Sequence, residues 1–498
     1  MAQRFGQYGQ SRFLEILPGL FSWSIIIGAI ILSLFAPAVA IVFIIIFDLY
    51  WMLRVFYFVI HVIAAYSQFR RTISVDWEQE VQKIAGYERV YHMILLPTYK
   101  EELSILEEAC EALIRAKYRK DRMIVVFGGE ERDQEHFKKC QAVLEEKYSG
   151  VFAELLFTVH PKDLPGEIPG KGSNLKFVAS QVRKVVDERQ IPYDDIVVSA
   201  FDVDTVAHPQ YFAKLAHTYL TIPNPTRASF QPVTVFSNNI WSATIPVRVT
   251  AFGTTFWLLG ELVRPERLWT FSSHSMPWRM LVDVGYWEPD LVSEDSRIFM
   301  QAFLHYNGKY RVVPIFLPVS MDTVAEGTYM QSLVALYKQQ RRWAWGVEHF
   351  PYMIRQFRNR PEISFFVKAK YIFNHVEGMF TWATAPLLIF ILGYLPFLTT
   401  HDAQSALMVN SPYTLEFMMR GATFGVFVTG ALNFMMLPPR PNSLSRVQWF
   451  VMLLQWMFLP ITFILFGAFP ALDAQTRFMF GKYLGFNVTN KNASSRRS

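Results

Sequence analysis

Two aspartates spaced two positions apart, Asp202 and Asp204, are the first residues whose types and spacing could do chemistry. They follow the apolar run 196–201, which has the pattern of a buried strand. Side chains at positions i and i+2 of an extended chain point to the same side. The two carboxylates can therefore share one hard divalent cation, which can bridge the phosphates of a nucleotide. The alternative is a solvated strand end that carries two acids by chance.

A second acidic pair, Glu294 and Asp295, opens a predicted helix that runs toward His305. The helix dipole stabilises a carboxylate in the first turn, which keeps Asp295 ionised. Such a carboxylate can take a proton from an attacking hydroxyl. The competing interpretation is an acidic pair that only complements the N-terminal charge of a surface helix.

A third group, Gln339, Arg342 and Trp343, lies at positions i, i+3 and i+4 of one predicted amphipathic helix, so the three share a face. An amide, a guanidinium that binds phosphate oxygens bidentately and an indole suit a diphosphate and a sugar ring. An interfacial helix with basic and aromatic anchors is the alternative. It leaves Gln339 without a role.

Two further turns precede predicted helices. The first, 97–102, follows a predicted strand, and its residues could hold a base and a ribose: Pro97, Thr98, Tyr99 and Glu101. Thr98 and Glu101 also fit a capping box. In the second turn, 170–175, Lys171 could neutralise phosphate at a helix start that favours an anion.

These residues lie in a block where short apolar runs alternate with polar helical stretches. The predicted strands are 91–97, 123–127, 155–159, 196–201 and 311–317, and the predicted helices between them are 101–117, 131–147 and 171–189. This alternation predicts an α/β domain with a mostly parallel sheet and nucleotide at the carboxyl ends of its strands.

Apolar segments flank the block on both sides. Hydrophobic residues make up 52% of the 498 residues and charged residues 18%, which favours a membrane protein. We predict a transmembrane hairpin at 1–72, a catalytic domain at 73–329, amphipathic interface helices at 330–365, transmembrane helices at 366–472 and a tail at 473–498. The net charge of +6 is too small for a nucleic-acid binder.

Basic residues predict that the domain and both ends of the chain face the cytoplasm, in a bacterial-type inner or plasma membrane. Arg70 and Arg71 follow the hairpin, and the tail carries Arg477 and Lys482. Three full crossings after the domain would instead put the tail outside. We favour the charge bias, with one of the three apolar segments re-entrant or doubled.

These motifs together resemble the family 2 membrane glycosyltransferases, the group that includes cellulose, chitin and hyaluronan synthases. The matching motifs are PTYKE, GKGSN, DVDT, SED and QQRRW, in the family's order, and the segment 486–491 (FNVTNK) is similar to the FxVTxK gating loop of cellulose synthase. The resemblance implies a GT-A (Rossmann-like) fold, a UDP-sugar donor, Mg²⁺ or Mn²⁺, and inversion at the anomeric carbon.

The resemblance also implies a role for each site residue. Asp204 would coordinate the metal, Asp202 would contact the nucleotide and the metal, and Asp295 would be the general base. Donor contacts would come from Pro97, Thr98, Tyr99, Glu101, Lys171, Gln339, Arg342 and Thr489. Glu294 and Trp343 would line the acceptor site.

The chain departs from the family after the second strand, where an Asp pair usually touches the base. Here the run is Phe127-Gly128-Gly129-Glu130-Glu131, so Glu130 or Glu131 is the candidate for that contact, and we favour Glu131. The identity of the nucleotide therefore stays open.

We expect a processive synthase that extends a polysaccharide. Transfer of one sugar to a lipid acceptor is the alternative, and a nucleotide-binding transporter or scaffold is a remote one. The expected partners are a nucleotide sugar, the acceptor and membrane lipids, but no nucleic acid.

Overall fold

The computed structural model describes residues 12–399, 405–439 and 445–485, and one sheet organises most of its first 330 residues. The eight strands are β1 (Tyr91–Pro97), β2 (Met123–Glu130), β3 (Glu154–His160), β4 (Ile196–Ala200), β5 (Val206–Ala207), β6 (Ala228–Phe236), β7 (His274–Pro277) and β8 (Arg311–Met321). Their order in the sheet is β3-β2-β1-β4-β7-β6-β8-β5. All five strands that the sequence predicted are present.

The sheet is mostly parallel, as the sequence predicted, with two strands that run the other way. Strands β3, β2, β1 and β4 are parallel, as are β6 and β8. However, β7 runs antiparallel to both β4 and β6, and β5 runs antiparallel to β8. The short strand β7 has only four residues, of which His274 and Ser275 are polar, so its sequence lacks the apolar run that marks the predicted strands.

Helices cover both faces of the sheet because its central strands are apolar on both sides. In β1, Met93 and Leu95 belong to one buried cluster and Ile94 and Leu96 to the other. The second of these clusters takes in α5 (Leu103–Arg115), α6 (Gln134–Tyr148) and α8 (Tyr211–Thr221). The first takes in α7 (Lys171–Glu188), α9 (Ile245–Leu262), α10 (Trp278–Val284) and α11 (Glu294–His305).

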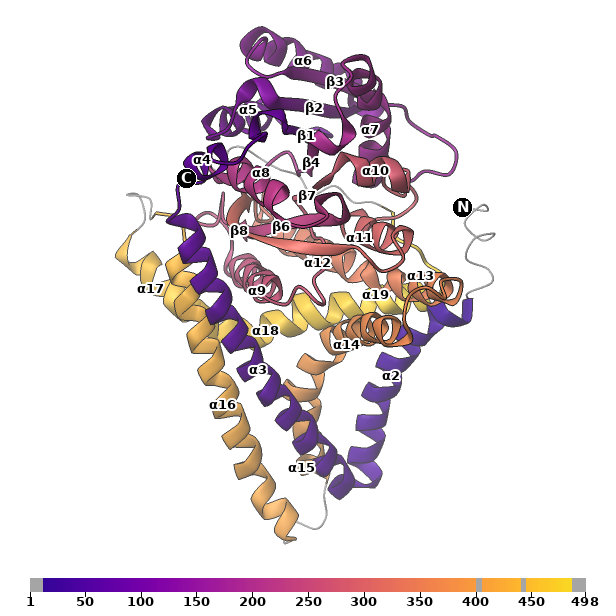
Figure 1. Cartoon of the computed structure of the whole chain (residues 1–498). Coiled ribbons are helices and arrows are strands. Elements are labelled where there is room, and N and C mark those ends of the chain that lie inside the picture. Colours follow the sequence, from indigo (N-terminus) through magenta and orange to yellow (C-terminus); the bar gives the residue numbers. More distant parts are fainter. Residues whose placement is uncertain (1–11, 400–404, 440–444, 486–498) are drawn as a thin grey trace.

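Long apolar helices extend away from the sheet domain (Figure 1). They are α2 (Arg12–Phe35), α3 (Pro37–Ile73), α14 (Phe365–Phe390), which is bent by 44° toward η8 and α15 (Leu392–Thr399), and α16 (Ala406–Met436). By length and composition, three helices of the described residues can cross a membrane: Arg12–Phe35, Pro37–Ile73 and Phe450–Met479. The bent pair would make a fourth. The chain is therefore suited to a membrane.

Between these helices and the sheet lies a layer of shorter helices. It contains α12 (Tyr329–Ala344), the 3₁₀ turn η7 (Trp345–Glu348) and α13 (His349–Arg358), in the range predicted for interface helices. It also contains the last helical segment: α17 (Arg446–Leu454), η9 (Gln455–Phe458), α18 (Leu459–Phe463), a π-helical turn (Ile464–Ala468) and α19 (Phe469–Met479). The short α4 (Trp77–Gln82) precedes β1.

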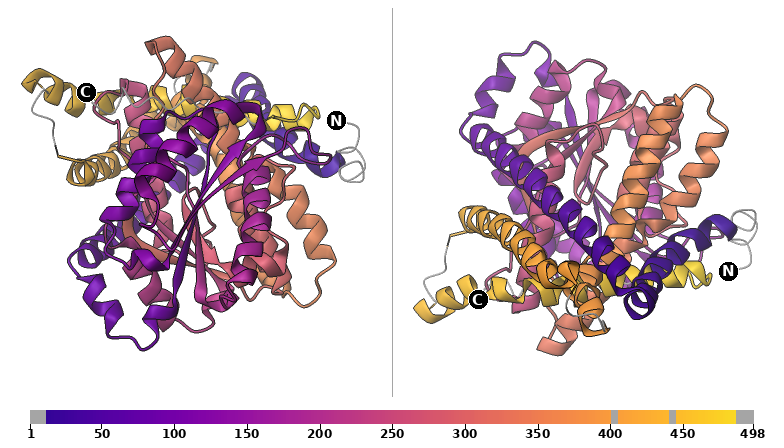
Figure 2. Two further views of the ribbon diagram at one scale, coloured as in Figure 1. Left: turned by 90° about the horizontal axis from the view of Figure 1, so that it is seen from above. Right: turned by 90° about the horizontal axis from the view of Figure 1, so that it is seen from below.

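The last segment runs across the base of the sheet domain and does not follow the long helices away from it (Figures 1 and 2). Its end is fixed to the start of α2, where Arg12 donates a hydrogen bond of 3.0 Å to the carbonyl of Phe478. Tyr483 also donates one of 2.7 Å to the carboxylate of Glu15. The described end of the chain therefore lies beside the beginning of α2, on the domain's side of the long helices.

Candidate active site

Three of the predicted site residues meet in one cluster, although they come from distant parts of the chain. Lys171 begins α7, Asp202 follows β4, and Asp295 lies in the first turn of α11. The ammonium Nζ of Lys171 lies 2.8 Å from Oδ1 of Asp202 and 3.0 Å and 3.2 Å from the two carboxylate oxygens of Asp295. The Lys171 side chain is only 8% exposed, so the cluster is largely shielded from water.

The electrostatics of the cluster favour a charged lysine. Burial by itself lowers the pKa of Lys171, but attraction to Asp202 and Asp295 outweighs burial and raises the pKa above its ordinary value. An ammonium held between two carboxylates is a strong, charge-assisted arrangement. It places a cation where negative charge from a substrate would also be attracted.

Polar residues of the segment before β7 bond the carboxylate of Asp202 and the backbone of Asp295. Ser272 donates a hydrogen bond of 2.8 Å to Oδ2 of Asp202, and Thr270 donates one of 2.6 Å to the backbone carbonyl of Asp295. Neither residue was predicted from the sequence. Their only local signal is the polar run 270–275, which does not indicate that the segment crosses the end of β4.

Asp204 faces a different neighbour from Asp202. It is 3% exposed, and its Oδ2 accepts a hydrogen bond of 3.1 Å from the amide of Asp322, directly after β8. The chain turns at the end of β4, where the amide of Thr205 donates to the carbonyl of Asp202. The pair Asp202 and Asp204 therefore joins the end of β4 to the end of β8.

The residues predicted to contact the nucleoside lie at the carboxyl end of β1. The amide of Thr98 donates a hydrogen bond of 2.8 Å to the carbonyl of Gly128 in β2, and the guanidinium of Arg132 lies 4.8 Å from the ring centre of Tyr99. The capping box at Thr98 was a wrong prediction: α5 begins at Leu103, and the carboxylate of Glu101 accepts from the amide of Tyr99 instead.

The chain has Gly128 and Gly129 where an aspartate pair was expected after the second strand, and this difference has a steric cause. A Cβ atom at Gly128 would lie 2.3 Å from Oδ1 of Asn174, and one at Gly129 would lie 2.5 Å from the ring of Phe137. Neither position can hold an aspartate while these neighbours stay in place. The amide of Asn174, which is one turn into α7, donates instead to the carbonyl of Gly128 and to the carboxylate of Glu130, each at 2.9 Å.

Of the two candidate glutamates, Glu130 points inward and Glu131 outward. Glu130 is 4% exposed and also lies 3.3 Å from Nδ1 of His160. Glu131 is exposed, and its carboxylate accepts from the amide of Lys162. Our choice of Glu131 stays a prediction. The buried Glu130, its alternative, and Asn174, which bonds it, are the site candidates that the structure adds.

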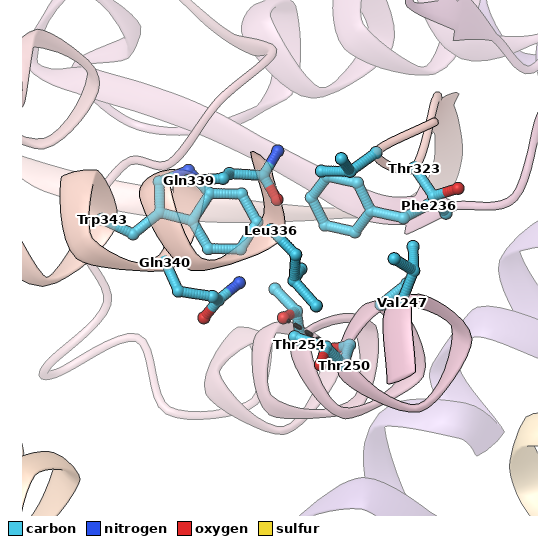
Figure 3. Close-up of a pocket in the computed structure, with 11 residues that line it drawn as sticks. Phe236, Val247, Thr250, Thr254, Thr323, Leu336, Gln339, Gln340 and Trp343 are labelled. Atoms are coloured by element: carbon cyan, nitrogen blue, oxygen red, sulfur yellow. Dashed lines mark hydrogen bonds between the residues drawn. The ribbon is translucent and has the colours of Figure 1, made fainter. Parts of the chain in front are cut away.

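The third predicted group lies on α12, and two of its members line a small pocket (Figure 3). Gln339 and Trp343 form one wall, and the ring of Trp343 lies 5.7 Å from the ring of Phe236 at the end of β6. Arg342 acts electrostatically on Glu294 at the start of α11. The helix therefore faces both the pocket and the acidic end of α11. Thr489, with the segment 486–491, lies outside the described residues.

A family model described as glycosyl transferase family group 2 matches residues 197–472, which is more than half of the chain. The match includes the aspartate pair, α11 and α12. The chain belongs to glycosyl transferase family group 2. It is therefore a glycosyltransferase, and its sheet with helices on both faces is a GT-A-like domain.

Solved structures resemble this family member only distantly. A mannosyltransferase from Pyrobaculum calidifontis, in complex with GDP-Man and Mn²⁺, is 13% identical, with a TM-score of 0.42 over 86% of this chain and 100% of that chain. TarS residues 1–349 from S. aureus, in complex with UDP-GlcNAc, are 13% identical, with a TM-score of 0.35 over 80% and 94%. No curated protein matches the chain.

The residues of this glycosyltransferase fit a divalent cation only in part. Among residues 12–399, 405–439 and 445–485, no group of three or more His, Cys, Asp or Glu side chains could hold a metal ion. Asp202 and Asp204 supply two hard carboxylates, which Mg²⁺ accepts when substrate phosphates provide further oxygens. The pair therefore fits a cation that binds together with a diphosphate.

Proposed function

We propose that this glycosyltransferase moves a sugar from a UDP-sugar to an acceptor at the membrane, with inversion at the anomeric carbon. The observation that supports this proposal is the cluster of Lys171, Asp202 and Asp295. A cation that can attract a diphosphate and a carboxylate that can accept a proton lie about 3 Å apart there. A direct displacement needs such a cation and such a base beside the same donor sugar.

The reaction is a single displacement. Asp295 takes the proton of an acceptor hydroxyl while its oxygen attacks the anomeric carbon from the face opposite the diphosphate. The bond between that carbon and the phosphate oxygen breaks, and its electron pair leaves with the diphosphate. Lys171 and Arg342 stabilise the charge that grows there. Asp204 and Asp202 would hold Mg²⁺ or Mn²⁺, which neutralises diphosphate charge when bound.

The metal role of Asp204 predicts a change in nucleotide binding. Replacing Asp204 by asparagine should remove the gain in UDP affinity that Mn²⁺ gives the wild-type protein, because the amide is a neutral and weaker ligand. Calorimetric titration of UDP with Mn²⁺ and with chelator would measure both affinities. If the variant still bound UDP more tightly with Mn²⁺, by the wild-type margin, Asp204 would not be a ligand.

Glu294 is suited to hold an acceptor hydroxyl. Burial raises its pKa to about 8, and the charge of Asp295 acts in the same direction, against Lys171 and Arg342. Below that pH the carboxyl keeps its proton and can donate a hydrogen bond. Above it, Glu294 is a second negative charge beside the proposed base.

Transfer is therefore expected to slow as the pH rises through about 8, where folded Glu294 loses its proton. In Glu294→Gln the amide donates at every pH, so this alkaline decline should disappear. Initial rates at saturating donor, across neutral and alkaline pH, would test the assignment. The same decline in both proteins would assign it to another group.

Two classes of acceptor remain, a lipid and a growing polysaccharide, and the pocket lined by Trp343 favours the lipid. The pocket is lined in part by Val247, Val324 and Leu336, which pack in one apolar cluster with Ala243 and with Phe466 of the π-helical turn. A polysaccharide passing from Trp343 toward the bilayer would need this cluster to open. A lipid acceptor needs only to bring its head group to Trp343. We therefore place single transfer to a lipid ahead of the polysaccharide synthase that the sequence favoured.

Product analysis would distinguish the two acceptors. Membranes containing the protein, supplied with radiolabelled UDP-sugars and Mn²⁺, are expected to yield one lipid-soluble labelled species. A long, water-soluble polymer would support the processive synthase instead. Absence of UDP release with every sugar and acceptor would support the remote alternative of a nucleotide-binding transporter or scaffold.

We also propose that the sheet domain and the end of the chain face the cytoplasm. Arg70 and Arg71 stand at the domain end of α3, and Arg477 stands at the end of α19 beside the start of α2. Positive residues favour the cytoplasmic side. Labelling of a cysteine placed at Lys482 by a membrane-impermeant reagent in intact cells would contradict this orientation.

A further inference from the structure

The turn that follows α12 is bonded to the start of the helix that carries the proposed base. Glu348 ends the 3₁₀ turn η7 and is 6% exposed. One oxygen of its carboxylate accepts a hydrogen bond from Oγ of Ser293, and the other accepts one of 3.1 Å from Nε1 of Trp345. Ser293 precedes Asp295 by two residues, and Trp345 follows Arg342 by three. One buried carboxylate therefore links the two segments.

A second contact beside the first links the same two segments. His349 lies 2.8 Å from Oγ of Ser296 through Nε2 and 3.1 Å from Nε of Arg297 through Nδ1. Burial and the positive charge of Arg297 hold the pKa of His349 well below its ordinary value. Its Nδ1 therefore accepts from Arg297, and its Nε2 donates to Ser296.

Arg297 makes this second contact rigid. It is 1% exposed, donates a hydrogen bond of 2.7 Å to Glu288 and lies 3.8 Å from the ring centre of Tyr352 on α13. A buried guanidinium with three such partners has one favoured position. The helix face at Ser296 and Arg297 is thereby fixed, and the bond from Ser293 to Glu348 fixes the end of the helix nearest the site.

We propose that Glu348 is a positioning residue that sets the distance between the proposed base Asp295 and the diphosphate clamp on α12. The inference rests on the proposed function, since it assigns Glu348 a role in that reaction. Glu348 acts through Ser293 and Trp345 and needs no contact with substrate. Displacement of a reacting group by about 1 Å can cost about 10²-fold in rate, so such a link has a large effect.

The chemistry of the link separates two substitutions. In Glu348→Ala, the hydroxyl of Ser293 and the indole N–H of Trp345 lose their buried acceptor. In Glu348→Gln, the side-chain carbonyl can accept from Trp345 while the amide donates to Oγ of Ser293. Glutamine can therefore keep the link although the negative charge is gone.

The test measures kcat and the donor KM for these variants in membranes. Glu348→Ala is expected to lower kcat by about 10²-fold with an unchanged donor KM, and Glu348→Gln should keep most of the wild-type kcat. Glu188→Ala, an exposed position at the end of α7, is the matched control and should behave like the wild type. Ser293→Ala, a milder change, should lower kcat in the same direction as Glu348→Ala.

A double-mutant cycle decides whether Ser293 and Glu348 act together. If they act through one bond, Ser293→Ala should have almost no further effect on kcat in the Glu348→Ala protein. If the two substitutions lowered kcat independently, so that their effects multiplied, the inference would be overturned while the proposed function would stand. An equal loss of kcat in Glu348→Ala and Glu348→Gln would have the same consequence. A wild-type protein without any turnover would overturn the proposed function, and with it this inference.

Discussion

Replacing Asp295 by asparagine is expected to lower kcat by about 10³-fold and to leave the Kd for UDP nearly unchanged. The amide has almost the shape of the carboxylate, but it cannot take the proton of the acceptor hydroxyl. Lys171 keeps its second partner, Asp202, at 2.8 Å, so the donor side of the cluster stays in place. Transfer rates and calorimetric titration with UDP would measure the two quantities separately.

The matched control for this variant is Asp187→Asn, a solvent-exposed aspartate on α7. It should transfer sugar at the wild-type rate. Substantial turnover in Asp295→Asn would show that another group accepts the proton. Loss of UDP binding together with turnover would instead place Asp295 among the donor contacts.

Replacing Lys171 by methionine is expected to destabilise the protein and to weaken donor binding. Without the ammonium, Asp202 and Asp295 face each other as largely buried carboxylates, and breaking a buried ion pair costs about 3 kcal/mol. The same change removes a positive charge that would attract the diphosphate. Thermal unfolding and UDP titration in detergent would measure the two losses, with the exposed Lys184→Met as the control.

A second substitution tests the cause of the instability. If it comes from unpaired carboxylates, the double variant Lys171→Met with Asp295→Asn should regain much of the lost thermal stability while remaining inactive. A double variant less stable than Lys171→Met would mean that packing of the lysine stem, and not charge, accounts for the loss.

Local sequence was sufficient wherever an element forms from its own neighbours in the chain. Apolar runs identified β1, β2, β3, β4 and β8. In β1, β2 and β4 the cause is burial on both faces, which requires apolar residues throughout. The acidic pair Glu294 and Asp295 marked the start of α11, whose first residue is Glu294. The spacing of Gln339 and Trp343 put both on one wall of the pocket.

Prediction failed where a residue's role depends on a distant partner. Thr98 resembles a helix cap, but its amide is bonded to the carbonyl of Gly128 in the neighbouring strand, and the helix begins later. Strand β7 is too short and polar to be recognised, yet it lies between β4 and β6 and makes the sheet mixed. The importance of Ser272 follows only from its position against Asp202.

The sequence by itself determined the residue types of the site, the five apolar strands and the membership in a glycosyltransferase family, because each depends on local pattern. Only the tertiary structure decided that Lys171 joins Asp202 to Asp295, that a Cβ atom at Gly128 would collide with Asn174, and that the last helices run beneath the domain. These features depend on contacts between residues far apart in the chain. Spacing along the sequence does not specify such contacts, because they are set by how complete elements pack against one another.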